Sequence, residues 1–174
     1  MTLSSETETT NSEQKLIAPL PHRKIGGFLI FIVVVMILNL IRNSLYFLAS
    51  LAVVTRKAQW EKFTNPESSN YHSYWKSVLI LDVVSNAIIV ILITITIIAF
   101  FRKRRTFPII AIFTTIVIFL LAFIGHYFEG FIPAIAHTAT YAKDGDNMMI
   151  RVLALGIWIP YYLLSKRVRE TFVR

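Results

Sequence analysis

The sequence predicts an all-α membrane protein with four transmembrane helices, and three observations lead to this prediction. First, 55% of the residues are hydrophobic and only 16% are charged, which is too little charge to cover a soluble surface. Second, the run from Ser77 to Phe101 has one ionisable side chain, Asp82, and exceeds the roughly 20 residues that a helix needs to span a membrane. Third, this run ends at the basic residues 102–105, as cytoplasmic helix ends do.

Composition also excludes several classes of function. The net charge of +8 does not indicate a nucleic-acid partner, because the basic residues cluster at the ends of apolar runs rather than on a soluble face. The chain has no cysteine, which rules out disulfides, thiolate metal sites and a cysteine nucleophile. We also expect no cleavable signal peptide, because the first apolar run begins only near Ile25, behind an acidic segment rich in Ser and Thr.

The chain divides into a tail and one domain. Residues 1–21 have almost nothing to bury and are predicted to form a disordered cytoplasmic tail, whereas residues 22–174 form a single four-helix domain. The first helix is expected at about 26–50, beginning at Gly26-Gly27. Arg42 and Asn43 interrupt its apolar run, which leaves two alternatives: one long tilted helix, or a break near Asn43. The length of the run favours a long helix that projects past the bilayer.

The remaining helices are expected at 77–101, 107–127 and 148–164. Pro108 is tolerated in a first helical turn, and Pro160 should kink the fourth helix or end its regular hydrogen bonding early. The connection 55–76 carries Trp and Tyr residues that suit a membrane interface. The connection 128–147 is broken by Asp144-Gly145-Asp146 and has room for a short interfacial helix within 131–142, and the basic tail 165–174 should lie along the membrane surface.

Basic residues are distributed unevenly between the two sides of this four-helix arrangement. One side receives ten lysines and arginines and the other receives five, so the positive-inside rule predicts that both termini are cytoplasmic. On the cytoplasmic side, six basic residues are expected to contact anionic lipid headgroups: Arg102, Lys103, Arg104, Arg105, Lys166 and Arg167.

Polar residues inside the predicted helices form a candidate binding site. Counted from Gly26 at about 1.5 Å per residue, Arg42 lies roughly 24 Å across the bilayer, and Asp82 enters from the opposite side to a similar depth. We therefore predict that Arg42 and Asp82 form an ion pair near the periplasmic side. Four further residues are expected in the same layer: Asn39, Asn86, His126 and Arg151. The alternative is structural, with polar groups joining helices and arginines extending to the headgroups.

No catalytic or metal-binding arrangement is visible. His126 and His137 lie eleven residues apart with Glu129 between them, which is not the spacing of a metal site, and no second pair of ligands accompanies them. No phosphate-binding loop or Ser/His/Asp arrangement can be identified. We expect no catalytic residue, no metal and no cofactor.

The C-terminal stretch Ile157–Val173, IWIPYYLLSKRVRETFV, resembles the end of a bacterial inner-membrane family known as DUF2569, a domain of unknown function. Two weaker features agree, namely Gly26-Gly27-Phe28 at the start of the first helix and Asp82 followed by Asn86 in the second. Phe28 stands where the family has Trp, and Asp82 stands where it has Glu. The resemblance implies four helices in the bacterial cytoplasmic membrane and supplies no activity.

From these observations we expect an uncharacterised, multi-pass protein of the bacterial inner membrane that acts as a non-enzymatic accessory or interaction subunit. Its partners would be membrane lipids, including anionic ones, together with a membrane protein or a second copy of the chain. One alternative is a small transporter or proton-coupled carrier that uses Asp82. A second alternative is a membrane enzyme that acts on lipid or glycan headgroups, with His126 or His137 as the base.

Overall fold

The structure, a computed structural model, describes residues 28–172, and every regular element in this range is a helix. Four of the helices are long and apolar enough to cross a membrane, which confirms the predicted fold class. The predicted tail 1–21 and the predicted helix start at Gly26-Gly27 lie outside the described residues. The elements in chain order are α2 (Phe28–Thr55), α3 (Lys57–Thr64), α4 (Trp75–Phe101), α5 (Phe107–Glu129), α6 (Pro133–Ala136), α7 (Ala139–Leu164) and α8 (Lys166–Thr171).

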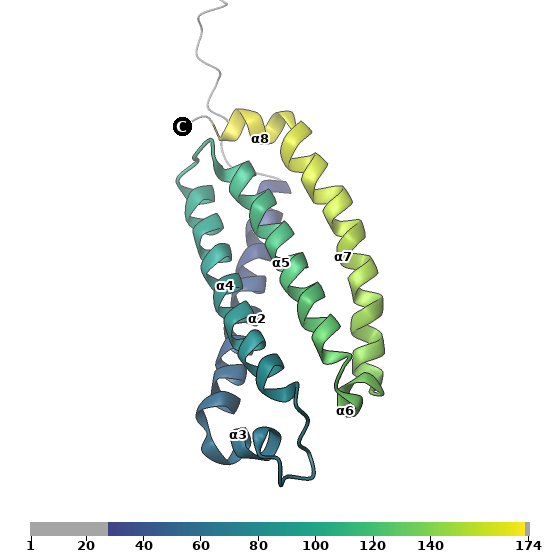
Figure 1. Cartoon of the computed structure of the whole chain (residues 1–174). Helices are drawn as coiled ribbons and strands as arrows, with labels where there is room; N and C mark the ends of the chain where they lie inside the picture. The colour runs from purple at the N-terminus through teal and green to yellow at the C-terminus, as the bar shows by residue number, and fades with distance from the viewer. Residues whose placement is uncertain (1–27, 173–174) are drawn as a thin grey trace, which may run out of the picture.

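The four long helices pack in chain order. α2 packs against α4, α4 against α5, and α5 against α7, while α2 and α7 make no comparable contact within residues 28–172. Successive long helices run in opposite directions, so α3 and α6 lie at one end of the molecule and α8 lies at the other (Figure 1). We call these the α3/α6 end and the α8 end. The bundle therefore has three packed sides and one open side, between α2 and α7.

The first long helix is continuous, which decides between the two alternatives that the sequence left open. The amide of Asn39 donates to the carbonyl of Val35 at 2.9 Å, and the amide of Asn43 donates to the carbonyl of Asn39 at 2.7 Å. Each polar side chain is thus satisfied by the turn before it. Neither asparagine breaks the helix, which continues to Thr55.

The prediction for the fourth helix was wrong at its start. α7 begins at Ala139 rather than near residue 148, with the Thr138 hydroxyl accepting a hydrogen bond from the backbone N–H of Tyr141. The Asp144-Gly145-Asp146 segment, which was expected to be a loop, is helical. Gly145 lies against the His126 ring of α5, so packing between helices outweighs the cost of about 1 kcal/mol for a helical glycine. α7 continues through Pro160 to Leu164.

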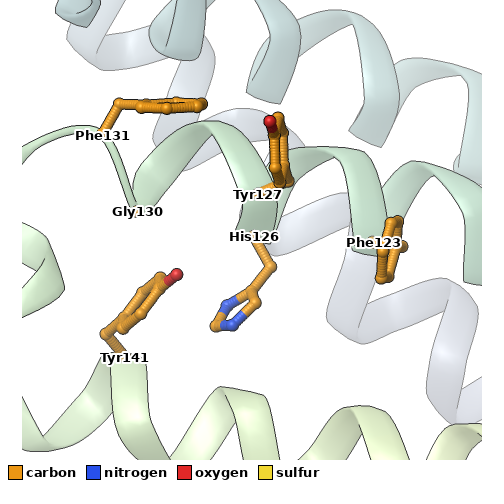
Figure 2. Close-up of a pocket in the computed structure, with 6 residues that line it drawn as sticks. All are labelled: Phe123, His126, Tyr127, Gly130, Phe131 and Tyr141. Carbon is orange, nitrogen blue, oxygen red and sulfur yellow. The ribbon is translucent and has the colours of Figure 1, made fainter.

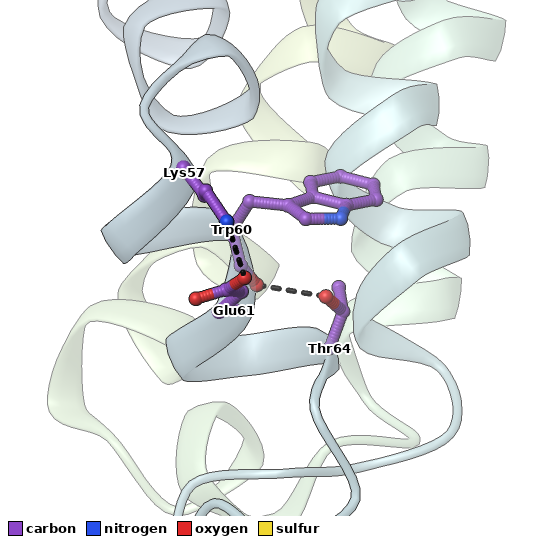
Figure 3. Close-up of polar contacts among 4 residues, drawn as sticks. All are labelled: Lys57, Trp60, Glu61 and Thr64. Atoms are coloured by element: carbon purple, nitrogen blue, oxygen red, sulfur yellow. Dashed lines mark hydrogen bonds and ion pairs between the residues drawn. The ribbon is translucent and has the colours of Figure 1, made fainter.

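A short helix that the sequence did not predict, α3, follows α2. Lys57 and Glu61 form an exposed ion pair at 3.8 Å, and the Thr64 hydroxyl donates to the carbonyl of Trp60 at 2.8 Å (Figure 3). The ring of Phe63 lies 4.7 Å from that of Trp75, at the start of α4. α3 therefore places aromatic side chains against the bundle and charged ones outside, as expected at a membrane interface. In the connection expected to hold a short helix, α6 spans Pro133–Ala136.

The largest buried core lies at the α8 end. Its residues come from α2, α4, α5, α7, α8 and the segment after α8: Leu29, Ile32, Val33, Ala99, Phe100, Phe107, Ala111, Tyr162, Val168 and Phe172. The Phe172 ring stacks on Phe107 at 4.3 Å and meets the edge of Phe100 at 5.4 Å. α8 lies across this end of the bundle (Figure 1), so the tail expected at the membrane surface also contributes to the core.

This packing predicts the effect of removing the Phe172 ring. Phe172→Ala should lower the free energy of unfolding by about 3 kcal/mol, because it leaves a cavity between Phe100 and Phe107. Thermal unfolding in detergent would measure the loss. Phe101→Ala is the matched control, because this neighbouring ring is 59% exposed and its removal should have little effect. Equal losses for the two variants would contradict the packing.

Candidate functional site

Asp82 lies on the inner side of α4 and is nevertheless exposed. The residues four before, four after and seven after it, Val78, Asn86 and Ile89, share its helix face and are all buried. The Asn86 amide donates to the Asp82 carboxylate at 2.8 Å, and the Ser50 hydroxyl of α2 is a second hydrogen-bonding neighbour. The carboxylate thus lies between Asn86 of its own helix and Ser50 of α2.

The predicted ion pair between Arg42 and Asp82 is not formed. Arg42 is exposed and has no ion pair with another residue of 28–172, whereas its neighbour Asn43 is 8% exposed and takes the inward position. Adjacent residues point about 100° apart around a helix, so only one of these two can face α4. The prediction that Arg42 and Asp82 lie at the same depth was also wrong. Ser50 is the α2 residue at the level of Asp82, and Arg42 lies eight residues, or about 12 Å, further toward the α8 end.

Two further carboxylates share the α3/α6 end with Asp82. Glu129, in the last turn of α5, lies close enough to Asp82 and to Asp144 of α7 for their charges to interact. The Asp144 carboxylate accepts a hydrogen bond from the Asn147 amide at 3.4 Å. No lysine or arginine in the described part of the chain forms an ion pair with any of the three. This grouping was not predicted, because Glu129 was noted only as an acidic residue of the non-cytoplasmic side and between His126 and His137, and Asp144 fell in a predicted loop.

His126 lies in the contact between α5 and α7, where its ring stacks on that of Tyr141 at 4.2 Å and 14°. Its Nδ1 atom is buried and has no hydrogen-bond partner. Gly130 allows this arrangement, since a Cβ atom there would lie 2.5 Å from the Tyr141 hydroxyl. The adjoining pocket has a volume of about 300 Å³ and is mostly apolar. Figure 2 shows the residues that line it: Phe123, His126, Tyr127, Gly130, Phe131 and Tyr141.

The contact between α4 and α5 includes a polar pair that the sequence analysis missed. The hydroxyls of Thr96 and Thr114 lie 2.8 Å apart and are buried, and each can be the donor. Three turns toward the α3/α6 end, the same helix faces carry Ser85 and Gly125. The Ser85 hydroxyl is buried without a partner, and a Cβ added at Gly125 would meet nothing within 4 Å. The two helices are therefore joined tightly at Thr96 and loosely near Asp82.

The other predicted site residues do not gather into one layer. Asn39 and Asn86 bond within their own helices. Arg151 lies in the middle of α7 rather than at its start, because the helix begins nine residues earlier than predicted. It is exposed, and its Nη1 atom lies 3.9 Å from the Met148 sulfur. The site that the structure supports is centred on Asp82, Asn86, Ser50 and Glu129.

His137 ends α6, separate from His126, and no group of three His, Asp or Glu residues within 28–172 has the spacing to hold a metal ion. The basic residues proposed for lipid contact lie at the α8 end. Arg102, Arg104, Arg105 and Lys166 are exposed there, and Lys103 takes the left-handed conformation (φ 50°) that closes α4. The side chain of Arg167 lies outside the described part of the structure.

Comparison with known proteins gives one match. The family described as a protein of unknown function (DUF2569) matches residues 22–173, which is most of the chain. No curated protein and no solved structure matches the chain.

The geometry around Asp82 predicts which pairs of substitutions interact. The effects of Asp82→Ala and Arg42→Ala on the free energy of unfolding should add, because the two side chains do not touch. The effects of Asp82→Ala and Asn86→Ala should fall short of additivity by roughly 0.5–1 kcal/mol, because each variant removes the same 2.8 Å hydrogen bond. Double-mutant cycles of thermal stability in detergent would measure both. Strong coupling between Arg42 and Asp82 would contradict the structure.

The two glycines of α5 should respond in opposite ways to the same substitution. Gly125→Ala should raise the free energy of unfolding by about 1 kcal/mol, since the new methyl group meets open space and alanine favours the helix. Gly130→Ala should lower it by about 1 kcal/mol, because the methyl group displaces the Tyr141 hydroxyl from its place above His126. Melting curves of both variants, recorded in one detergent, test the pair. The same sign for both would contradict this packing.

Proposed function

The chain belongs to the DUF2569 family, whose function is unknown, and from this premise we propose that it is a non-enzymatic accessory or interaction subunit of the bacterial cytoplasmic membrane. The long helices would cross that membrane four times. The site around Asp82 would be the part that meets a partner, a ligand or water from the periplasm.

The charge distribution supports this orientation. The α8 end carries the basic run 102–105, together with Lys166, whereas the α3/α6 end carries Glu129 and Asp144. The positive-inside rule assigns the basic end to the cytoplasm, and with it both termini of the chain. In that position, each basic side chain near the surface would attract anionic lipids by about 1 kcal/mol.

One observation carries the proposal. Asp82 and Glu129 belong to different helices, point into the bundle near its α3/α6 end, and have no ion-pair partner among the described residues. Carboxylates within a membrane-spanning segment are costly unless something compensates their charge. A polar or cationic group from outside the chain would compensate it, which is the property expected of an interaction subunit.

Photo-crosslinking in native membranes tests this proposal. Benzoylphenylalanine in place of Tyr46, which is 58% exposed and lies one turn from Ser50, should yield a discrete adduct with another protein. The same substitution at Phe113 of α5, which is 57% exposed, is the matched control and should yield mainly lipid adducts. Mass spectrometry would identify the partner. The same lipid adducts at both positions would count against an interaction subunit.

A proton-coupled carrier is the second candidate, and the exposure of Asp82 on the inner side of α4 favours it. In that case Asp82→Asn should abolish a pH-dependent flux in reconstituted vesicles, because the amide cannot exchange a proton. Asp146→Asn is the control, since Asp146 is an exposed acid one position from Gly145. Unchanged flux in the Asp82 variant, or no flux in the wild type, would dismiss the carrier.

A further inference from the structure

The pocket beside His126 lies on the outer side of α5, near the α3/α6 end. Phe123 and Tyr127, two of the residues that line it, are 54% and 59% exposed. Phe123 is nine residues from Thr114, whose hydroxyl meets Thr96 of α4, and at about 100° per residue this spacing puts two side chains on opposite faces of a helix. The Phe123 side of the pocket therefore faces away from α4, toward the lipid that would surround the spanning helices.

The pocket covers the last two turns of α5 and the segment that follows them. Phe123 lies six residues before the end of the helix at Glu129, and Gly130 comes directly after it. At about 1.5 Å per residue, α5 is roughly 35 Å long, slightly more than the thickness of about 30 Å of a bilayer core. The pocket therefore lies where acyl chains give way to headgroups, and a ligand dissolved in the membrane can reach it.

The walls of the pocket are aromatic. Tyr127 and Phe131 meet edge to face with their ring centres 5.1 Å apart, and Tyr141 of α7 stacks on His126 at 4.2 Å (Figure 2). Aromatic rings bind other rings by offset stacking or by edge-to-face contact. These walls favour a flat ligand that contains a ring.

Two polar groups of the lining have no hydrogen-bond partner among the described residues. The Tyr141 hydroxyl lies against Gly130, where a Cβ atom would be 2.5 Å from it, and it donates to no atom of residues 28–172. The imidazole of His126 lies against the Tyr141 ring, and its buried Nδ1 atom is also unpartnered. An interfacial aromatic belt would explain the rings. It does not explain the unpartnered hydroxyl and imidazole, whereas a ligand with hydrogen-bond acceptors does.

We propose that this pocket binds the head of a lipid-soluble quinone. The flat quinone ring would pack against the aromatic walls, one carbonyl oxygen would accept a hydrogen bond from the Tyr141 hydroxyl, and the His126 imidazole would offer a second donor. The apolar tail would leave the pocket past Phe123 and lie among the acyl chains. The inference does not rest on the proposed interaction role, which involves the separate site around Asp82.

Other membrane ligands fit the pocket less well. An anionic headgroup would find no lysine or arginine among the six lining residues, and an ammonium headgroup, which the rings would attract, would find no carboxylate among them. An acyl chain would leave both polar groups unpaired. The volume of about 300 Å³ is at the lower limit for ligand pockets, which suits one ring system rather than a whole lipid.

Photolabelling tests the proposal. The full-length protein in phosphatidylcholine vesicles is irradiated with an azido derivative of decylbenzoquinone, and mass spectrometry locates the label, which should lie on peptides that contain the lining residues. Unlabelled decylbenzoquinone should halve this labelling at about one tenth of the concentration that decylbenzene requires. Decylbenzene is the matched control ligand, because it has the same tail and a six-membered ring but no carbonyl oxygen to accept a hydrogen bond.

Variants of the full chain link the binding to the Tyr141 hydroxyl. Tyr141→Phe keeps the ring stacked on His126 and removes one oxygen atom, so the concentration of decylbenzoquinone that halves the labelling should rise about fivefold. The concentration of decylbenzene should stay the same. Tyr71→Phe is the control, because Tyr71 is 41% exposed in the connection before α4 and does not line the pocket; it should change neither value.

The two glycines of α5 supply a second pair of variants. Gly130→Ala moves the Tyr141 hydroxyl and should weaken competition by decylbenzoquinone, whereas Gly125→Ala adds its methyl group in open space and should leave competition unchanged. Thermal melting of each variant shows whether the fold is intact. Tyr141→Phe, which keeps the packing of the ring, remains the decisive comparison should Gly130→Ala be unstable.

Four results would each overturn the inference. Label on peptides outside the pocket would place the ligand elsewhere, and equal competition by decylbenzene would assign the pocket to apolar chains. Stronger competition by decyltrimethylammonium than by decylbenzoquinone would assign it to an ammonium headgroup. Unchanged competition by decylbenzoquinone in Tyr141→Phe would remove the hydrogen bond on which the choice of a quinone depends.

Discussion

The cost of leaving a polar group unpaired in a membrane governs this structure. Several polar side chains within the long helices make their hydrogen bonds as locally as possible: Asn39 and Asn43 bond to the preceding turn, and Thr96 meets Thr114 across one helix contact. These local solutions let four helices pass through lipid with few long-range polar contacts. The exceptions include Ser85 and His126, whose buried polar atoms have no hydrogen-bond partner among the described residues.

Much of the fold could be predicted because helix length and apolar composition depend on the solvent rather than on neighbours. The helix predicted at 77–101 matches α4, which begins at Trp75, and Pro108 correctly indicated the start of α5. α7 was harder to predict, because Asp144-Gly145-Asp146 has the composition of a turn. The helical state of this segment is favoured by the contact of Gly145 with His126, which lies nineteen residues earlier and which no local pattern reveals.

Two quantities limited the prediction of the candidate site: the depth of each residue in the membrane and the direction of its side chain around the helix. Counting residues from assumed membrane boundaries put Arg42 and Asp82 at one level, but the helices are longer than the bilayer core is thick, so the count drifts by about two turns. The direction of each side chain around its helix was the second unknown, because Asn43 rather than its neighbour Arg42 faces α4. Asn86, which was expected in the same polar layer as Asp82, lies one turn from it and donates to its carboxylate, whereas the proximity of Glu129 depends on how α5 packs beside α4.

The packing of α2, α4, α5 and α7 strictly in chain order bears on how the protein is made. Each helix that leaves the ribosome finds its packing partner already inserted, so the bundle can assemble by adding one hairpin at a time, with little search between distant segments. Contacts from α8 and Phe172, which follow all four long helices in the chain, then complete the core that joins these helices.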